Sequence, residues 1–287
     1  MNKTARTLTA LATLAVLSLS NSLAQGSRPV VVSSGCEVKG AFDRFTSLLG
    51  PTRFSSAANW SGYQNAGWTP PRGYRHVTWD GVDKKFTDYN YIPNDYFNTS
   101  LKQGLLYSTK GNGFRVSSDV YGYLNPSYKQ LYKPYSGYNL FSPLYSNVLD
   151  VSFETPGYKG DRARVHGFGT VFADVDKANV TRMEFFDEGG YSLGLWYAEP
   201  CDYGHSFLGV YFADKWVSKV RIWLGDKPMD AYQNEDAYTD LVALDDFVYD
   251  EPWKWGYVYK AAENYTKEPA YKEPAYKEPA PVAPPSY

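Results

Sequence analysis

Short runs of β-branched and aromatic residues, several of which alternate apolar and polar positions, dominate the second half of the chain. The clearest runs are 163–174, 180–186, 193–198, 206–212, 217–224 and 241–249. Each is rich in β-branched or aromatic residues and is bounded by turn-forming residues, which is typical of β-strands. We therefore predict a strand for each run.

The run 217–224 shows which side of such a strand faces the core. Ser218, Val220, Ile222 and Leu224 occupy every second position and form the more apolar face, so we expect them to point inward. The sequence Asp-Glu-Gly-Gly at 187–190 predicts a hairpin turn between two runs. Evenly spaced strands without a βαβ pattern favour an all-β fold, an antiparallel β-sandwich that is most simply a jelly roll.

The first half of the chain is less regular. The segment 41–49 is the one good helix candidate in the body, with Phe42, Phe45, Leu48 and Leu49 on one side. A stretch from 121 to 145 is rich in tyrosine and in turn residues. Long helical periodicity is otherwise hard to find, which agrees with an all-β body.

The two ends differ in composition from this body. Residues 1–24 combine Lys3 and Arg6 with an apolar run and a small-residue cleavage site, which is typical of a secretory signal peptide. We expect a linker at 25–35, the sandwich domain at 36–255 and a disordered tail at 256–287. The tail repeats Tyr-Lys-Glu-Pro-Ala, and its regular prolines favour an extended chain.

Charge and hydropathy narrow the possible partners. The chain has 29 Lys and Arg against 31 Asp and Glu, a net charge of −2, which does not suit nucleic-acid binding. The apolar run near the N-terminus is shorter than the roughly 20 residues that a membrane-spanning helix needs. We therefore predict a secreted protein, extracellular or attached to the cell surface, without a transmembrane segment.

Cys36 and Cys201 are the two cysteines of the chain. In an exported protein, two thiols more often form one disulfide than remain free, so we predict a Cys36–Cys201 bond. The alternative is a pair of unbonded, buried cysteines.

An acidic turn follows the run 163–174. Asp174, Asp176 and Asn179 are spaced so that their side chains could converge on one cation, and Asp245 from the last predicted strand could join them. Oxygen ligands of this kind suit a structural Ca²⁺. The alternative is a solvated turn in which the Asp side chains cap backbone N–H groups.

The tyrosine-rich stretch offers a possible binding surface. Tyr128, Tyr132, Tyr135 and Tyr138 lie in a segment with many turn residues, and exposed aromatic rings there could stack on sugars or contact a protein. The alternative is a loop folded over the sheet with its tyrosines half buried. Four Asn-x-Ser/Thr triplets, at Asn59, Asn98, Asn179 and Asn264, are glycosylation sites if the host glycosylates them.

Signals for catalysis are poor, and we predict that the protein is not an enzyme. The three histidines are scattered, and the chain has neither a Gly-x-Ser-x-Gly nor a His-Glu-x-x-His motif. Glu154, Glu184 and Glu251 are the carboxylates to test for glycoside hydrolysis, whose paired groups need not be close in sequence.

Several segments of the body resemble an uncharacterised family of exported bacterial β-sandwich domains, often found ahead of a PEP-CTERM-type sorting tail. These segments are Trp-Asp-Gly-Val at 79–82, then 105–116, 166–179, 184–194, 206–212 and 243–252. The resemblance implies a sandwich fold in an extracellular or envelope setting. The family carries no established activity.

The tail resembles the Tyr/Lys/Pro repeats of mussel foot adhesive proteins. Its tyrosines are candidates for oxidative cross-linking, namely Tyr265, Tyr271, Tyr276 and Tyr287. We therefore expect a non-catalytic protein of an extracellular matrix, cell wall or biofilm that adheres or cross-links through the tail, with a polysaccharide or matrix protein as partner. The alternatives are a glycan-binding module whose tail is a spacer, and a hydrolase acting on glycans.

Overall fold

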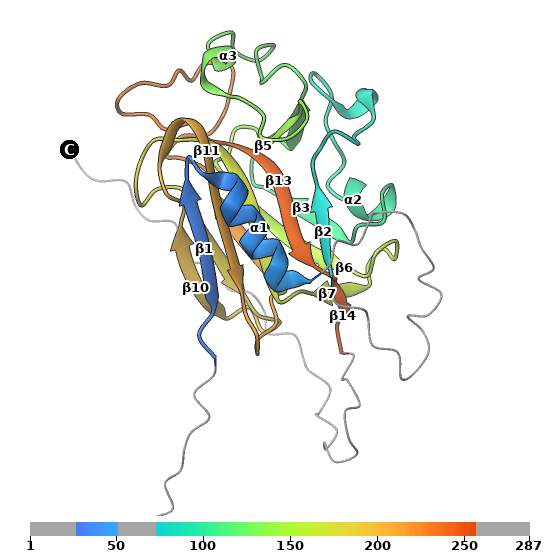
Figure 1. Ribbon diagram of the computed structural model, residues 1–287. Coiled ribbons are helices and arrows are strands. Elements are labelled where there is room, and N and C mark those ends of the chain that lie inside the picture. The colour runs from blue at the N-terminus through green and yellow to red at the C-terminus, as the bar shows by residue number, and fades with distance from the viewer. Residues whose placement is uncertain (1–26, 51–72, 257–287) are drawn as a thin grey trace, which may run out of the picture.

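Two antiparallel sheets make up the body of the protein in the computed structural model, which describes residues 27–50 and 73–256 (Figure 1). Sheet A contains, in spatial order, β1 (Val30–Gly35), β11 (Cys201–Tyr211), β8 (Gly167–Val175), β13 (Ala243–Asp250), β5 (Leu140–Pro143) and β4 (Phe114–Ser117), with β2 (Tyr74–Val77) also paired to β13. Sheet B contains β10 (Ser192–Tyr197), β9 (Arg182–Phe186), β12 (Lys219–Trp223), β6 (Val148–Glu154), β7 (Arg162–Arg164) and β14 (Trp253–Lys254), with β3 (Leu105–Ser108) paired to β6. The predicted antiparallel β-sandwich is confirmed.

The main core lies between the two sheets. Val220, Ile222 and Leu224 are buried there, as the alternation in their strand predicted. Val217 is buried as well, although the same alternation placed it outside, because it precedes β12 and forms a bridge to Val165. The predicted hairpin is also present, since β9 pairs with β10 across the 187–190 turn.

The predicted helix, α1 (Val38–Leu49), begins three residues earlier than expected and lies along the outer face of sheet A (Figure 1). Its Phe45 is completely buried against that sheet. Gly169 and Gly209 are cross-strand partners beneath the ring, and a Cβ on Gly209 would lie 2.7 Å from it. Two glycines side by side thus make the depression in which the helix is seated.

Two expectations about strand boundaries were wrong. Part of the predicted linker 25–35 is strand β1, which pairs with β11 along its full length and closes that edge of sheet A. The predicted strand 163–174 is two strands, because the chain passes from β7 in sheet B to β8 in sheet A. At the crossing, the backbone N–H groups of His166 and Gly167 both donate to Asp250 Oδ1, each at 2.7 Å.

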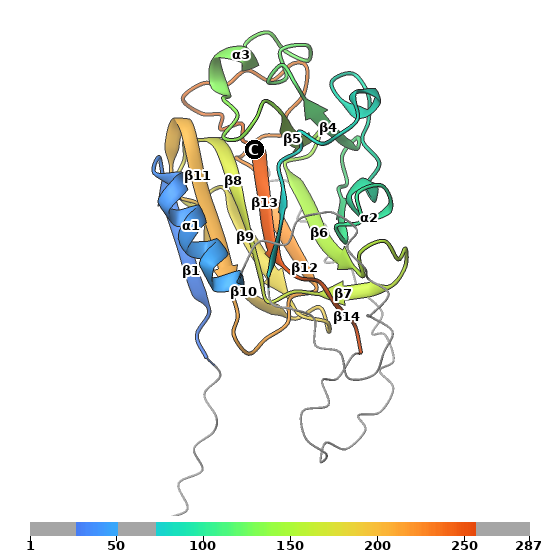
Figure 2. The same ribbon diagram turned by 45° about the vertical axis from the view of Figure 1, so that its right-hand side comes forward.

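The connections carry short helices that the pattern did not predict. They are the 3₁₀ helix Lys84–Phe86, α2 (Tyr96–Thr99) and α3 (Tyr128–Leu131). The β12–β13 connection, drawn in orange, runs beside α3 at the top of the molecule (Figure 2). There the Tyr128 hydroxyl donates to the Asp230 carbonyl at 2.6 Å. These two connections cover one end of the sandwich.

The predicted signal peptide at 1–24 and the repeats from residue 257 onward lie outside the described residues. Within 27–50 and 73–256, none of the helices has the length and apolarity needed to cross a membrane.

Candidate metal centre

Three carboxylates from two distant parts of the chain meet at the end of β8. Asp174, Asp176 and Glu235 each offer an oxygen that lies within 4.8 Å of the others. We call these three residues the acidic site. Asp174 has a left-handed backbone conformation, with φ of 67°, so the strand turns sharply where its carboxylate is presented.

Asp174 is the innermost member of the acidic site, with 0% of the residue exposed. Its Oδ1 accepts a hydrogen bond from the Tyr203 N–H at 2.7 Å. Its Oδ2 has no hydrogen-bond partner among the described residues, and the same holds for Oδ1 of Asp176. A buried carboxylate oxygen without a donor is costly, so such oxygens point to a missing proton or cation.

The loop that approaches Asp174 from β11 is held by the disulfide. The β11–β8 register shifts between Cys201 and His205, so residues 202–204 bulge out opposite Asp174. The predicted Cys36–Cys201 disulfide is confirmed and fixes one end of this bulge. A Cβ on Gly204 would lie 2.3 Å from the Cys201 sulfur, which explains the glycine beside the bond.

Glu235 reaches the site from the β12–β13 connection. Its Oε2 accepts a hydrogen bond from the Leu241 N–H at 3.0 Å. Asp240, in the same connection, accepts from the N–H groups of Asp176 and Lys177 and so fixes the turn that carries Asp176. Sequence reasoning missed Glu235, because about 60 residues separate it from Asp174 and no local pattern marks it.

The electrostatics of the site favour a bound positive charge. Burial raises the pKa of Asp174 to about 7, and burial together with the Asp174 charge raises the pKa of Glu235 to about 8. Burial and the charge of Asp202 raise the pKa of Asp176 as well. The nearby Lys177 amine is engaged by Asp226 at 2.6 Å. An all-oxygen, negatively charged set is the kind of ligand set that Ca²⁺ prefers.

The structure therefore brings together only part of the set of residues that we predicted to bind a cation. Asp174 and Asp176 belong to the acidic site, and Asn179 lies three residues farther along the turn, exposed and with φ of 62°. Asp245 was expected to join them, but it lies in a different group of side chains. Its strand carries a bulge between Leu244 and Phe247, which redirects its carboxylate.

Asp245 and Asp246 form a second buried acidic group, which we call the carboxyl pair. Asp245 Oδ2 accepts from the Tyr135 N–H and Asp246 Oδ1 from the Ser136 hydroxyl, both at 2.6 Å. His76 Nε2 lies 2.7 Å from Asp246 Oδ2. Burial and the adjoining Asp246 carboxylate raise the pKa of Asp245 to about 9.

Two of the four tyrosines expected to bind a glycan are packed inside the protein. Tyr128 and Tyr132 are 0% and 3% exposed and form a small core with Leu140 and Leu241, so the prediction that their rings stack on sugars was wrong. Their hydroxyls donate to backbone carbonyls of the β12–β13 connection. Tyr135 is partly buried, and Tyr138 is exposed.

The candidate glycosylation sites that the structure describes differ in their exposure to solvent. Asn98 is 0% exposed, and its amide donates to Glu154 at 2.5 Å and accepts from the Gly157 N–H at 2.7 Å. A glycan on this nitrogen is incompatible with the fold, so that prediction was wrong. Asn179 is exposed, while Asn59 and Asn264 lie outside the described residues.

The carboxylates considered for hydrolysis each have their own partners. Glu251 forms a buried two-pronged ion pair with Arg75. Glu154 accepts hydrogen bonds from Asn98 and from the Gly160 N–H, and Glu184 accepts one from the Ser192 hydroxyl.

No protein-family model and no curated protein matches the chain. Among solved structures, the chain is similar to the K2 cleaved adhesin domain of Lys-gingipain, with a TM-score of 0.34 and 11% sequence identity, over 62% of this chain and 99% of that domain.

Proposed function

We propose that the protein is an exported, non-catalytic β-sandwich of an extracellular matrix, cell wall or biofilm, and that Ca²⁺ bound at the acidic site holds one end of its fold together. The observation that carries the calcium site is the buried Asp174, whose Oδ2 has no donor and whose carboxylate lies within 4.8 Å of the oxygens of Asp176 and Glu235. Calcium would supply the missing positive charge at these oxygens.

The location of the acidic site supports a structural role for the ion. Its ligands come from the end of β8 and from the β12–β13 connection, next to the bulge tied down by the disulfide. An ion there would add a cross-link between the end of β8 and the β12–β13 connection, which the hydrogen bonds from the Asp176 and Lys177 N–H groups to Asp240 already join. The Cys36–Cys201 disulfide supports export, because disulfides persist in oxidising compartments. A calcium site of modest affinity would agree with that setting, because extracellular calcium sites bind the ion only weakly.

The calcium site can be tested by titrating the full, secreted chain with CaCl₂ in a calorimeter after treatment with EDTA. We expect one ion per chain and at least tenfold weaker binding by Asp174→Asn, because an amide nitrogen would replace a ligand oxygen. Glu235→Gln should weaken binding as well. Asp43→Asn, on the exposed side of α1, is the matched control. Equal binding by Asp174→Asn and the control would overturn the site.

The adhesive role is supported by composition alone, through the Tyr-Lys repeats of the tail. Oxidation of the secreted chain by a peroxidase with hydrogen peroxide should give dityrosine-linked oligomers. A variant in which Tyr265, Tyr271, Tyr276 and Tyr287 are all changed to Phe should form far fewer of them. Oligomers that persist undiminished in that variant would exclude the tail as the cross-linking segment.

A further inference from the structure

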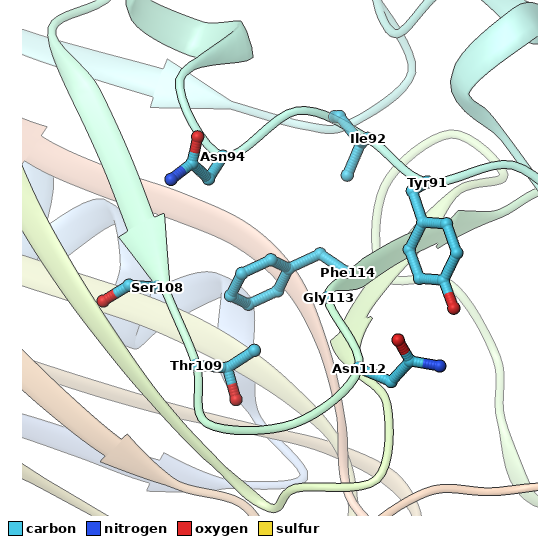
Figure 3. A pocket seen from close by; sticks show the side chains of 8 residues that line it. All are labelled: Tyr91, Ile92, Asn94, Ser108, Thr109, Asn112, Gly113 and Phe114. Atoms are coloured by element: carbon cyan, nitrogen blue, oxygen red, sulfur yellow. The ribbon is translucent and has the colours of Figure 1, made fainter.

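A shallow hollow of about 400 Å³ lies where β3 and β4 meet the segment before α2 (Figure 3). It is lined by Tyr91, Ile92, Asn94, Ser108, Thr109, Asn112, Gly113 and Phe114. Of the described residues, these eight line the hollow and none of them is charged. Its volume falls within the range of small-molecule sites.

The hollow combines an apolar floor with a polar rim. Phe114 and Ile92 are 4% and 3% exposed and form the floor. Asn94, Ser108 and Asn112 surround the Phe114 ring, as Figure 3 shows. Their side chains are solvent-exposed and form no hydrogen bond with any other described residue. Amides and hydroxyls both donate and accept, so the rim can match groups that do the same.

Tyr91 is held in place at the edge of the hollow. The Arg115 guanidinium lies 3.0 Å from the centre of its ring, and Arg115 itself is buried beneath it. Gly113, with φ of 70°, lies against one edge, where a Cβ would approach the ring to 2.9 Å. The residue is nevertheless 45% exposed. Arg115 and Gly113 thus hold the Tyr91 ring in place, and the exposed part of the ring is available to a ligand.

We propose that this hollow binds one or two rings of a neutral sugar chain. Sugars present apolar C–H faces, which pack on aromatic rings, and hydroxyls, which both donate and accept hydrogen bonds. A charged ligand would find no opposite charge in the lining. The inference rests on the proposed function only for its extracellular setting, and it moves glycan binding from the buried Tyr128 and Tyr132 to Tyr91.

The test uses the full, secreted chain and a defined panel of glycans in affinity gel electrophoresis. Laminarin, mannan and cellohexaose represent neutral chains, and alginate and polygalacturonate represent acidic ones. We expect binding to at least one neutral glycan, followed by calorimetry of that pair. Tyr91→Ala and Asn112→Ala should each weaken binding at least tenfold, and Tyr91→Phe, which keeps the ring, should weaken it less than Tyr91→Ala.

Tyr232→Ala is the matched control, because Tyr232 is 84% exposed and does not line the hollow. It should bind like the wild type. The proposal is overturned if no neutral glycan binds, if only acidic glycans bind, or if Tyr91→Ala binds as tightly as the control. A CaCl₂ titration of each variant reports on the acidic site separately, so failure of either proposal leaves the other standing.

Discussion

The acidic site and the carboxyl pair lie on neighbouring strands of the same sheet, yet the charge of their buried carboxylates is compensated in different ways. Asp174 on β8 and Asp245 on β13 are both 0% exposed. Each has one carboxylate oxygen without a hydrogen-bond partner among the described residues, and burial raises the pKa of each. The surroundings of the two groups differ, and this difference is the reason that we expect a proton at one and a cation at the other.

In the carboxyl pair, neighbouring groups of the protein compensate for the burial of the two carboxylates. The Tyr135 N–H, the Ser136 hydroxyl and His76 all contact the two carboxylates. Asp246 is 1% exposed, so both groups are closed to solvent. One proton shared between the two carboxyl groups accounts for the remaining oxygen, in agreement with the raised pKa of Asp245.

In the acidic site, the carboxylates outnumber the donors. Three converge, Asp202 lies close enough to raise the pKa of Asp176, and two of the three are partly exposed. A single proton would leave most of this charge unbalanced, whereas a divalent cation can enter from solvent and neutralise it. Asp174 and Asp245 are equally buried, so the burial of these two residues does not distinguish the groups. The groups differ in the number of carboxylates and in whether solvent reaches any of them.

The largest effect should come from removing the disulfide beside the acidic site. The bond closes a loop of 165 residues, so Cys36→Ser with Cys201→Ser should lower the free energy of unfolding by about 4 kcal/mol. Urea denaturation of both proteins measures this change. Because the bond fixes the bulge opposite Asp174, calcium binding should weaken at least tenfold, while the carboxyl pair should be unaffected. Unchanged calcium affinity in the folded double variant would contradict this link.

Removing calcium should have the next largest effect. At a free concentration one hundred times the dissociation constant, a ligand stabilises the folded state by about 2.7 kcal/mol. For a domain of this size, EDTA should therefore lower Tm by about 5–10 °C in a thermal scan. The Asp174→Asn variant should show little or no shift, whereas Asp245→Asn should shift like the wild type. A full EDTA shift in Asp174→Asn would contradict our assignment of the ligands.

Sequence patterns predicted the parts of the fold that depend on local periodicity. The alternation in β12 and the apolar side of α1 correctly identified buried residues such as Ile222 and Phe45. The crossing at His166 was missed, because Val165 and His166, which link β7 to β8, give no turn signal in the sequence. What divides the two strands is the contact of two N–H groups with Asp250, about 84 residues away, which no local pattern reveals.

The sequence predicted only those members of the acidic site that are neighbours in sequence. Asp174 and Asp176 lie on one turn and were identified together. Glu235 was missed because it lies in a connection about 60 residues farther along the chain. Asp245 was wrongly included because the side that a strand residue faces depends on bulges. The bulge at 245–246 turns Asp245 toward Tyr135. Likewise, tyrosine content alone could not distinguish the buried Tyr128 from the exposed Tyr91.

The pH dependence of stability should distinguish the carboxyl pair, with an effect that is smaller per pH unit than the loss of calcium. The pKa of Asp245 is about 9 in the folded protein, against an ordinary value near 4. Between these values the folded state holds a proton that the unfolded chain has lost, so this residue makes stability fall as pH rises, by at most about 1.4 kcal/mol per pH unit. Asp245→Asn cannot lose a proton and should remove this slope.

Urea denaturation of the wild type and Asp245→Asn at several pH values from 5 to 8.5 measures the difference. The comparison cancels the contributions of all other groups that both proteins share. Asp245→Asn should gain stability relative to the wild type as pH rises. A constant difference across the range would mean that Asp245 is already ionised in the folded protein, and the shared proton would have to be abandoned.

The smallest effect concerns a single hydroxyl of the carboxyl pair. The Ser136 hydroxyl donates to Asp246 at 2.6 Å in partly buried surroundings, and the Ser192 hydroxyl donates to Glu184 at 2.7 Å on the surface. Ser136→Ala should cost about 1 kcal/mol, because Asp246 loses a donor that water replaces poorly. Ser192→Ala, its matched control, should cost less than about 0.5 kcal/mol. Equal costs in urea denaturation would show that the loop over Asp246 admits water freely, and the contrast between the closed pair and the open acidic site would then disappear.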